Sequence, residues 1–230
     1  MAKRPFPGQT KTRMTPALTT EEAANLYACF LQDVLATVRK VPQITPFIAY
    51  APANEEAEAY FSQLAPDFGR IPQLGDDLGA RLDGVLSHCF HNDYTQVVAM
   101  NSDSPSLPAA YLAEAFAQLD DPAVDVVLGP CEDGGYYAIG WKRPFPRLVR
   151  DVQMSTNHVL QDTLAIAQEE NLRVALLPTW YDVDELAELR RLQRELRHNS
   201  AIAPHTHQFF ESREWRLETN SPLTTRHSLQ

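Results

Sequence analysis

Residues 126–140 read VVLGPCEDGGYYAIG, and this stretch decides the fold that we expect. Apolar residues 126–128 predict a buried strand, and residues 136–141 predict a second one. The turn between them holds two acidic residues followed by two glycines, and glycine lets a backbone take a positive φ and approach a ligand closely. Carboxylates beside such a turn can reach a metal ion or a hydroxyl group. The stretch therefore predicts a ligand site at the carboxyl edge of a sheet.

Strands and helices alternate along the chain up to residue 198, which predicts a three-layer α/β/α sandwich with a mostly parallel central sheet. Further strands are expected over 47–51, 68–73, 95–101 and 173–178, and helices over 19–38, 54–64, 80–90, 108–119, 156–170 and 184–198. Thr19 with Glu22 predicts a capping box for the first of these helices, Asn54 can cap the second, and Ser155 is a possible cap of the helix over 156–170. We therefore expect one domain over 1–198. The pattern stops at Asn199, so residues 199–230 are expected to form a poorly ordered or loosely docked tail.

The composition excludes several classes of partner. The chain has 20 Lys and Arg against 30 Asp and Glu, a formal net charge of −10, so a broad nucleic-acid-binding face is not expected. No apolar run is long enough to span a bilayer, and no signal-peptide pattern opens the chain. Three widely spaced cysteines favour a reducing compartment. We expect a cytoplasmic protein that binds neither nucleic acid nor membrane, and a homodimer is compatible with this composition.

A basic loop opens this acidic chain. Residues 1–18 contain four Lys and Arg side chains, among them Lys11 and Arg13, around Gly8. Glycine amides together with Lys and Arg can bind phosphate oxygens through backbone N–H groups and charge-assisted hydrogen bonds. A solvated basic terminus is the alternative. The spacing of a Walker A loop is absent, so the segment is not a P-loop of that kind.

Three aspartates at expected strand and loop ends are candidate metal ligands. Asp103 follows the strand over 95–101, where its carboxylate would face the crevice of the sheet. Mg²⁺ is bound by one or two carboxylates together with phosphate oxygens, and a turn aspartate before Pro105 is the alternative. Asp182 and Asp184 offer a second carboxylate, although Asp184 is also well placed to cap the final helix.

Two other acidic pairs have both a functional and a structural interpretation. Glu132 and Asp133 can bind a metal or an acceptor, or they can accept hydrogen bonds from turn amides. Asp76 and Asp77 follow Gly75 and are expected to cap a helix, while a contact from this turn to a ligand is the alternative.

Five motifs occur in the same order as in the bacterial selenodomain-associated transferases, also labelled arsenosugar-type glycosyltransferases, and the chain resembles this family. The motifs are GQTKTRM (8–14), QLGDDLGARL (73–82), MNSDSPSLP (100–108), GPCEDGGYYAIG (129–140) and YDVDELAELRRL (181–192). That family belongs to the glycosyltransferase-A-like nucleotide-diphospho-sugar transferase superfamily, and the resemblance covers about residues 2–196. The chain is more distantly similar to phosphoenolpyruvate and phospholactate guanylyltransferases.

The resemblance implies a nucleotide, either a nucleoside triphosphate or a nucleotide sugar, and a small-molecule acceptor in one crevice. On this basis we assign catalysis to Asp133, Lys11 and Arg13, nucleotide binding to Gly8, Lys11, Arg13, Gly75 and Asp77, acceptor binding to Asp133, Gly134 and Gly135, and the binding of Mg²⁺ or Mn²⁺ to Asp103, Asp182 and Asp184.

One departure from the family concerns the first strand. Family members usually carry an apolar strand directly before the segment with which this sequence begins. The strand is central in the superfamily, and its loss would leave unpaired backbone groups in the sheet. We therefore expect the first strand to be missing, and our hypothesis is a chain truncated by a misplaced start codon. An in-frame apolar run encoded upstream of Met1 supports this hypothesis, and a stop codon immediately upstream contradicts it.

Three functions fit these residues. The favoured one is metal-dependent nucleotidyl transfer from a nucleoside triphosphate to a small phosphorylated or hydroxylated acid, because a triphosphate needs the positive charge of the basic loop. The second is a glycosyltransferase that uses a nucleotide sugar, with Asp133 as the base. The third is a degenerate nucleotide-binding or partner-binding module without activity.

Overall fold

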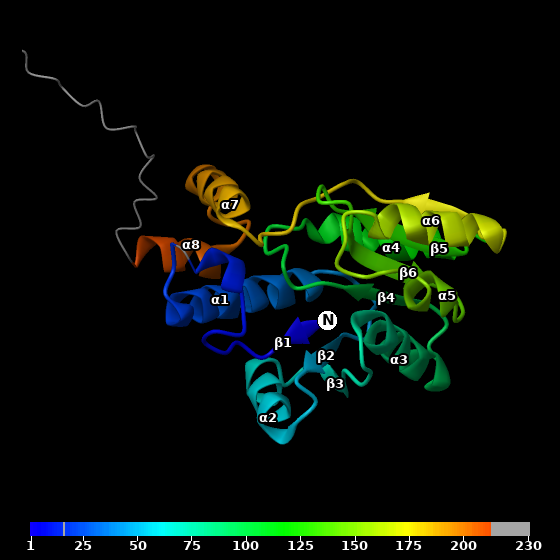
Figure 1. The fold of residues 1–230 in the computed structure, drawn as a ribbon, viewed down its shortest axis with the longest axis horizontal. Helices are drawn as coiled ribbons and strands as arrows, with labels where there is room; N and C mark the ends of the chain where they lie inside the picture. The colour runs from blue at the N-terminus through cyan, green and yellow to red at the C-terminus, as the bar shows by residue number, and fades with distance from the viewer. Residues whose placement is uncertain (16, 213–230) are drawn as a thin grey trace, which may run out of the picture.

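The computed structural model describes residues 1–15 and 17–212 and confirms the predicted α/β fold with helices on both faces of a mostly parallel sheet (Figure 1). The strands are β1 (Ala2–Lys3), β2 (Phe47–Ala51), β3 (Gly69–Pro72), β4 (Val97–Met100), β5 (Val126–Pro130), β6 (Tyr136–Trp141) and β7 (Val174–Leu176). The helices are α1 (Thr20–Val38), α2 (Glu55–Leu64), α3 (Leu78–His91), α4 (Ala109–Asp120), α5 (Arg147–Arg150), α6 (Val159–Glu169), α7 (Leu186–His198) and α8 (Pro204–Glu211), with a 3-10 helix η1 (Thr12–Met14). Within the described ranges, no helix combines the length and the apolar character needed to cross a membrane.

The strands form two hydrogen-bonded groups that meet at the start of the chain. The first has the order β1-β2-β3 and is parallel throughout. The second has the order β4-β6-β5-β7, in which β6 is antiparallel to both neighbours and β5 is parallel to β7. The amine of Met1 donates to the carbonyl oxygen of Met100 at 2.7 Å, which links the two groups. The motif of 126–140 is thus the β5–β6 hairpin, the antiparallel exception in the sheet.

The first strand is present but short, so the expectation that it would be missing is corrected. The two residues of β1 pair with Tyr50 and Ala51 of β2. Beyond β1, between the β2 and β4 segments, lies a cavity of about 320 Å³ with apolar walls that include Phe47, Ala49 and Val97. Side chains therefore leave an open space between β2 and β4, next to Met1.

Alternating side chains of β5 divide the core into two layers. Val126 and Leu128 pack against α3, α5 and α6 on one face, where the buried side chains include Leu148. Val127 packs on the opposite face with residues of α4, among them Leu119. Apolar residues that alternate in this way place one helical layer on each side of the sheet.

Side-chain caps begin three helices as predicted. Thr19 and Glu22 form a capping box at α1, in which the Glu22 amide donates to Thr19 Oγ1 at 3.2 Å and the Thr19 amide donates to Glu22 Oε2 at 2.7 Å. Asn54 caps α2, and Asp77 caps α3 by accepting the Ala80 amide at 2.7 Å. Ser155 does not cap α6, because that helix begins later, after His158.

The predicted domain boundary at residue 198 differs from the structure, because the chain continues into α8. Phe209 and Phe210 of this helix are buried against the core that contains α1. Asp33 of α1, only 1% exposed, accepts the amides of His205 and Thr206 at 2.9 and 2.8 Å and the Thr206 hydroxyl at 2.6 Å. The carboxylate therefore binds donors at the start of α8. The rest of the predicted tail, 213–230, lies outside the described residues.

We expect Asp33→Ala to lower the free energy of unfolding by about 3 kcal/mol, because it leaves buried donors at the start of α8 without an acceptor. Urea denaturation measures this loss. The control is Asp67→Ala, which breaks the ion pair between Asp67 and Arg39. Their side chains are 50% and 41% exposed, so we expect a loss of about 1 kcal/mol or less in the free energy of unfolding. Equal losses in the two variants would contradict the capping role of Asp33.

Candidate active site

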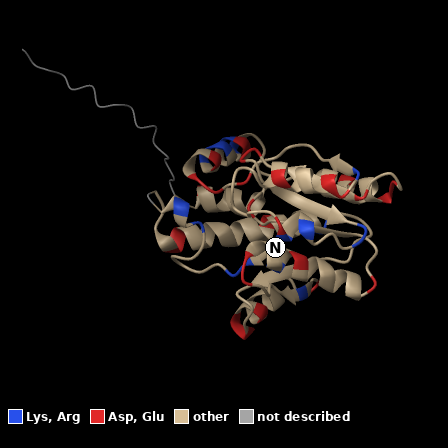
Figure 2. Ribbon diagram, turned by 45° about the vertical axis from the view of Figure 1, so that its right-hand side comes forward, with Lys and Arg blue, Asp and Glu red and all other residues tan. Residues whose placement is uncertain are grey.

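Two adjoining cavities lie where β1, β4 and β6 come together. One, of about 440 Å³, is called the basic cavity, and its charged walls are Lys3, Lys11, Arg13, Arg81, Asp103 and Asp184. The other, of about 490 Å³, is called the acidic cavity, and its charged walls are Arg13, Asp103, Asp133, Asp182 and Asp184. In the ribbon of Figure 2, Asp and Glu positions lie beside the N-terminus in this central region. The two cavities share Asp103 and Asp184, so these carboxylates stand at their boundary.

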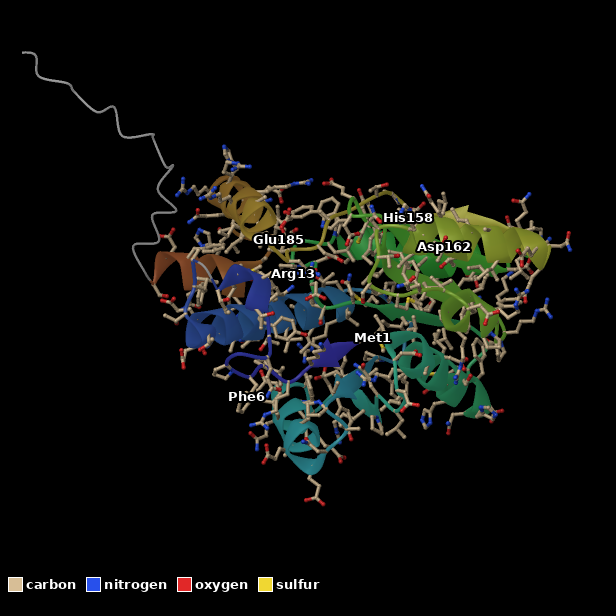
Figure 3. All side chains as sticks on the ribbon, viewed as in Figure 1. Met1, Phe6, Arg13, His158, Asp162 and Glu185 are labelled. Atoms are coloured by element: carbon tan, nitrogen blue, oxygen red, sulfur yellow. The ribbon has the colours of Figure 1, made fainter. Side chains whose placement is uncertain are left out.

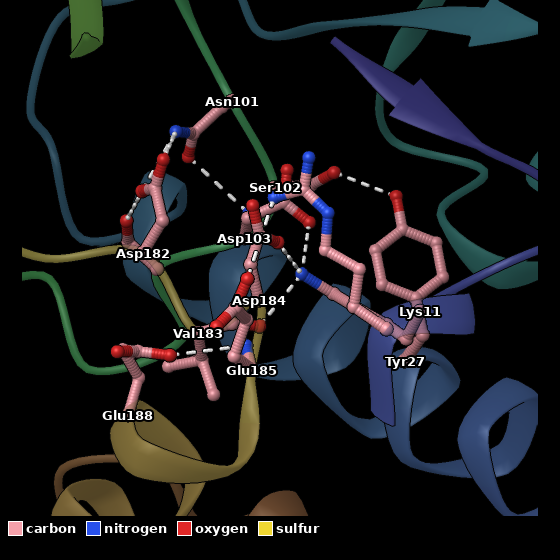
Figure 4. A network of polar contacts seen from close by, with 12 residues as sticks. Lys11, Tyr27, Asn101, Ser102, Asp103, Asp182, Val183, Asp184, Glu185 and Glu188 are labelled. Carbon is pink, nitrogen blue, oxygen red and sulfur yellow. Dashed lines mark hydrogen bonds and ion pairs between the residues drawn. The ribbon is translucent and has the colours of Figure 1, made fainter. Parts of the chain in front are cut away.

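Lys11 binds both boundary carboxylates (Figure 4). Its ammonium lies 2.5 Å from Asp103 Oδ1 and 2.8 Å from Asp184 Oδ1, and it also donates to the Val183 carbonyl oxygen at 2.8 Å. Burial alone would lower the pKa of Lys11, but the charges of Asp103 and Asp184 outweigh it and raise that pKa above its ordinary value. Lys11 is therefore a charged, almost enclosed group, with 5% of its side chain exposed.

Asp182 and Asp184 have different surroundings. Asp182 accepts the Asn101 amide at 2.8 and 2.9 Å and the Ser104 hydroxyl at 2.5 Å, and burial, above all other causes, raises its pKa. Asp184 was predicted to cap the final helix, but it does not. The cap of α7 is Glu185, which forms a capping box with Glu188. The structure thus brings Asp184 to Asp103 and leaves Asp182 in a separate set of hydrogen bonds.

The oxygens around the Lys11 ammonium fit a hard divalent cation. Across 1–15 and 17–212, no group of three or more His, Cys, Asp or Glu side chains is arranged to hold a metal ion. Asp103, Asp184 and the Val183 carbonyl nevertheless offer three oxygens around one point, at distances of 2.5 to 2.8 Å from the ammonium. Mg²⁺ is typically held by one or two carboxylates and completed by water and substrate phosphates. Water and substrate phosphate oxygens would complete the coordination of a cation held by these residues.

The two acidic residues in the turn between β5 and β6, Glu132 and Asp133, have different surroundings. Glu132 forms an ion pair with Arg191 of α7 at 2.7 Å and is not among the walls of either cavity. Asp133 lines the acidic cavity, and its Oδ1 accepts the Gly135 amide at 2.9 Å. Gly134 has a φ of +90°, and its carbonyl oxygen accepts the Leu160 amide at 2.9 Å. Glu132 is therefore structural, whereas Asp133 is held toward the cavity.

The predicted nucleotide-binding residues fall into two groups. Lys11 and Arg13 line the basic cavity, and Arg13 lies near Glu185, at 3.9 Å (Figure 3). Gly8, Gly75 and Asp77 are not among the residues that line either cavity. Polar residues that line the basic cavity but were not assigned to the site from the sequence include Lys3, Thr10, Gln73 and Arg81. Of these, Lys3 could have been found from its positive charge within the basic loop over 1–18, and Arg81 from its positive charge within the motif over 73–82.

This fold, with a polar crevice at the central strands, is that of a transferase of the nucleotide-diphospho-sugar transferase type. The chain belongs to the family described as "Uncharacterized protein conserved in bacteria (DUF2064)", whose model matches residues 34–156. A crystal structure from Desulfovibrio desulfuricans G20, of a protein provisionally assigned as a nucleotide-diphospho-sugar transferase, is 30% identical with a TM-score of 0.83. That match covers 92% of this chain and 93% of the other.

Two more distant structures share the fold alone. CMP:2-keto-3-deoxy-manno-octonic acid synthetase, solved with CTP, is 12% identical with a TM-score of 0.51, over 74% of this chain and 88% of its own. A cytidylyltransferase from Leptospira borgpetersenii serovar Hardjo-bovis (strain JB197) is 10% identical with a TM-score of 0.51, over 80% of this chain and 82% of its own. No curated protein sequence matches this chain.

Proposed function

We propose that this protein is a metal-dependent glycosyltransferase that uses a nucleotide-sugar donor and an uncharged hydroxyl acceptor. The observation that carries the proposal is the pair of adjoining cavities with opposite charge, which share Asp103 and Asp184. A group-transfer enzyme needs two substrates in contact, and here the donor phosphates and the acceptor have chemically distinct places. The assignment of the similar Desulfovibrio protein as a nucleotide-diphospho-sugar transferase supports the same class, as does the resemblance to the selenodomain-associated transferases.

The basic cavity is the donor site in this proposal. Lys3, Lys11, Arg13 and Arg81 line it and would bind the phosphate oxygens by charge-assisted hydrogen bonds. Asp103 and Asp184 would hold a divalent cation at its boundary, and that cation would neutralise charge on the departing diphosphate.

The acidic cavity is the acceptor site. Asp133 would take the proton of the acceptor hydroxyl, whose oxygen then bonds to the anomeric carbon of the sugar as the bond from that carbon to the phosphate oxygen breaks. The nucleoside diphosphate leaves with the electron pair of that bond. The hydrogen bond from the Gly135 amide to Asp133 Oδ1, at 2.9 Å, fixes the direction of the carboxylate for this step.

The charge of the acidic cavity favours an uncharged acceptor over the acid that we expected from the sequence. Its charged walls are four aspartates and Arg13, and because Lys11 pairs with Asp103 and Asp184, it is chiefly Asp133 and Asp182 that would repel a carboxylate or phosphate on the acceptor. Apolar walls that include Leu82, Met154 and Val159 would contact a non-polar part of the acceptor. An acceptor with a hydroxyl group and an apolar face therefore matches the cavity best.

Nucleotidyl transfer remains the second candidate, and one observation favours it. Four cationic side chains line the basic cavity, which would suit a triphosphate. Incubation with Mg²⁺ and panels of nucleotide sugars and nucleoside triphosphates, together with neutral hydroxyl acceptors and small phosphorylated or hydroxylated acids, distinguishes the two. Acceptor-dependent release of a nucleoside diphosphate supports glycosyl transfer, whereas acceptor-dependent release of pyrophosphate supports nucleotidyl transfer. Release of neither product, with no nucleotide binding in calorimetry, would refute both.

We expect Asp133→Asn to reduce kcat by about 100-fold, because an amide cannot take the acceptor proton. The asparagine side-chain oxygen can still accept the Gly135 amide, so the turn should keep its shape, and donor binding measured by calorimetry should change little. The control is Glu132→Gln, which removes a charge from the same turn outside both cavities. If Glu132→Gln lost as much activity as Asp133→Asn, Asp133 would not be the base.

A further inference from the structure

The ammonium of Lys11 stands in the place that a metal ion would take. Each of its three N–H donors has an oxygen acceptor within 2.8 Å, and these acceptors are the Asp103 and Asp184 carboxylates and the Val183 carbonyl. The same oxygens are hard ligands of the kind that Mg²⁺ and Mn²⁺ prefer. One cation, the Lys11 ammonium, therefore occupies this position (Figure 4).

We propose that Lys11 is a resident counter-ion that closes the metal site until donor phosphates draw its ammonium away from Asp103 and Asp184. The metal site then opens when the donor nucleotide enters the basic cavity. This inference rests on the proposed function, because it assigns a phosphate-bearing donor to that cavity.

Electrostatics explains why an ammonium and a metal ion exclude one another here. Without a cation, the carboxylates of Asp103 and Asp184 would face each other as like charges in a partly buried place. A metal ion on the same oxygens would meet the Lys11 ammonium at close range, so the ammonium must leave first. Its departure is costly while no other acceptor is present, because an unpaired buried charge is strongly unfavourable. Donor phosphates supply that acceptor.

The structure allows the side chain of Lys11 to move while its backbone stays in place. Lys11 has a φ of 50° and a ψ of 40°, a left-handed conformation that is uncommon for residues other than glycine and that fixes where the side chain starts. Thr10 holds the preceding turn by accepting the Phe6 amide at 2.9 Å and donating to the Phe6 carbonyl oxygen at 2.8 Å. A lysine stem is flexible, and Lys11 already lines the basic cavity. Rotation of the stem therefore suffices.

Titration with Mn²⁺ in the absence of nucleotide tests this inference, with binding followed by calorimetry and by the electron paramagnetic resonance signal of free Mn²⁺. Lys11→Met should bind Mn²⁺ at least about tenfold more tightly than the wild-type protein, because no ammonium competes for the carboxylates. The matched control is Lys40→Met, an exposed lysine outside both cavities, which should bind Mn²⁺ as the wild type does. The double variant Lys11→Met/Asp184→Asn should lose the gain, because the gained site includes the Asp184 carboxylate.

A Lys11→Met protein that binds Mn²⁺ no more tightly than the wild type would overturn the inference and make Lys11 a permanent structural ion pair. If Lys11→Met does not fold, Lys11→Gln provides the same test, since it keeps a polar side chain but removes the charge. Binding of a nucleotide by the wild-type protein is measured separately. A wild type that binds none would refute the proposed function, and the metal titrations would still decide whether Lys11 closes the site.

Discussion

Asp103→Asn is expected to weaken metal-dependent nucleotide binding by at least about 1,000-fold, a loss of about 4 kcal/mol. Asp103 lies just after β4, where its amide donates to Asn101 Oδ1 at 3.2 Å and its carbonyl oxygen accepts the Val183 amide at 2.9 Å. The backbone is thus held by contacts that the substitution leaves intact. The change replaces a negative oxygen at the boundary of the two cavities, which also pairs with Lys11 at 2.5 Å, by a neutral amide that holds a hard cation less strongly.

Calorimetry with a nucleotide in the presence of Mg²⁺, repeated in the presence of a chelator, measures this effect. The matched control is Asp182→Asn, because Asp182 lines the acidic cavity yet is bound to Asn101 and Ser104 rather than to Lys11. The control should keep metal-dependent binding within about tenfold of the wild type, and thermal melting checks that both variants fold. If Asp182→Asn lost binding and Asp103→Asn did not, the metal site would be misassigned.

Local sequence signals predicted the parts of the fold that local interactions determine. The capping box of Thr19 and Glu22 and the cap at Asn54 depend on residues three positions apart, so the sequence displays them directly. Apolar runs likewise revealed β4 and β5, because buried strands need such runs. The α/β fold follows from the alternation of these elements.

Long-range contacts determined the features that the sequence did not show. Asp184 has the local surroundings of a helix cap, but an ammonium 173 residues earlier in the chain binds it instead. Helix α8 shows no strong pattern of its own and is held by Asp33, 173 residues before Thr206. Glu132 and Asp133 are neighbours with equal chemistry, but Arg191 pairs with Glu132, whereas Asp133 lines the acidic cavity. Sequence spacing carries no information about such approaches, so these assignments required the structure.

The glycine turn between β5 and β6 is also the place where one added methyl group should destabilise the protein most. Gly134→Ala is expected to lower the free energy of unfolding by at least about 4 kcal/mol, since it combines backbone strain with a clash. Gly134 has a φ of +90°, which residues with a Cβ rarely adopt. A Cβ there would lie 2.0 Å from the carbonyl oxygen of Asn157 and 2.7 Å from its carbon, and backbone atoms cannot rotate away as a side chain can.

The clash would also change the shape of the acidic cavity. Gly134 accepts the Leu160 amide at 2.9 Å, so the turn is anchored at the start of α6, and Asn157 is itself a wall of the cavity. To admit the methyl group the turn must move away from Asn157, which carries Asp133 with it. A Gly134→Ala protein that still folds should therefore lose transferase activity together with stability.

Urea denaturation of two matched glycine variants isolates this cause. In Gly135→Ala the nearest atom to the new Cβ would be a carboxylate oxygen of Asp133 at 3.2 Å, which a small side-chain rotation can relieve. In Gly84→Ala, on an exposed position of α3, the nearest atom lies at 3.5 Å, and the higher helix propensity of alanine should stabilise the protein by up to about 1 kcal/mol. If Gly134→Ala cost no more than Gly135→Ala, the turn would not require a glycine at 134. The contact with Asn157 would then be adjustable, and the position of Asp133 in the cavity would depend on the Gly135 amide alone.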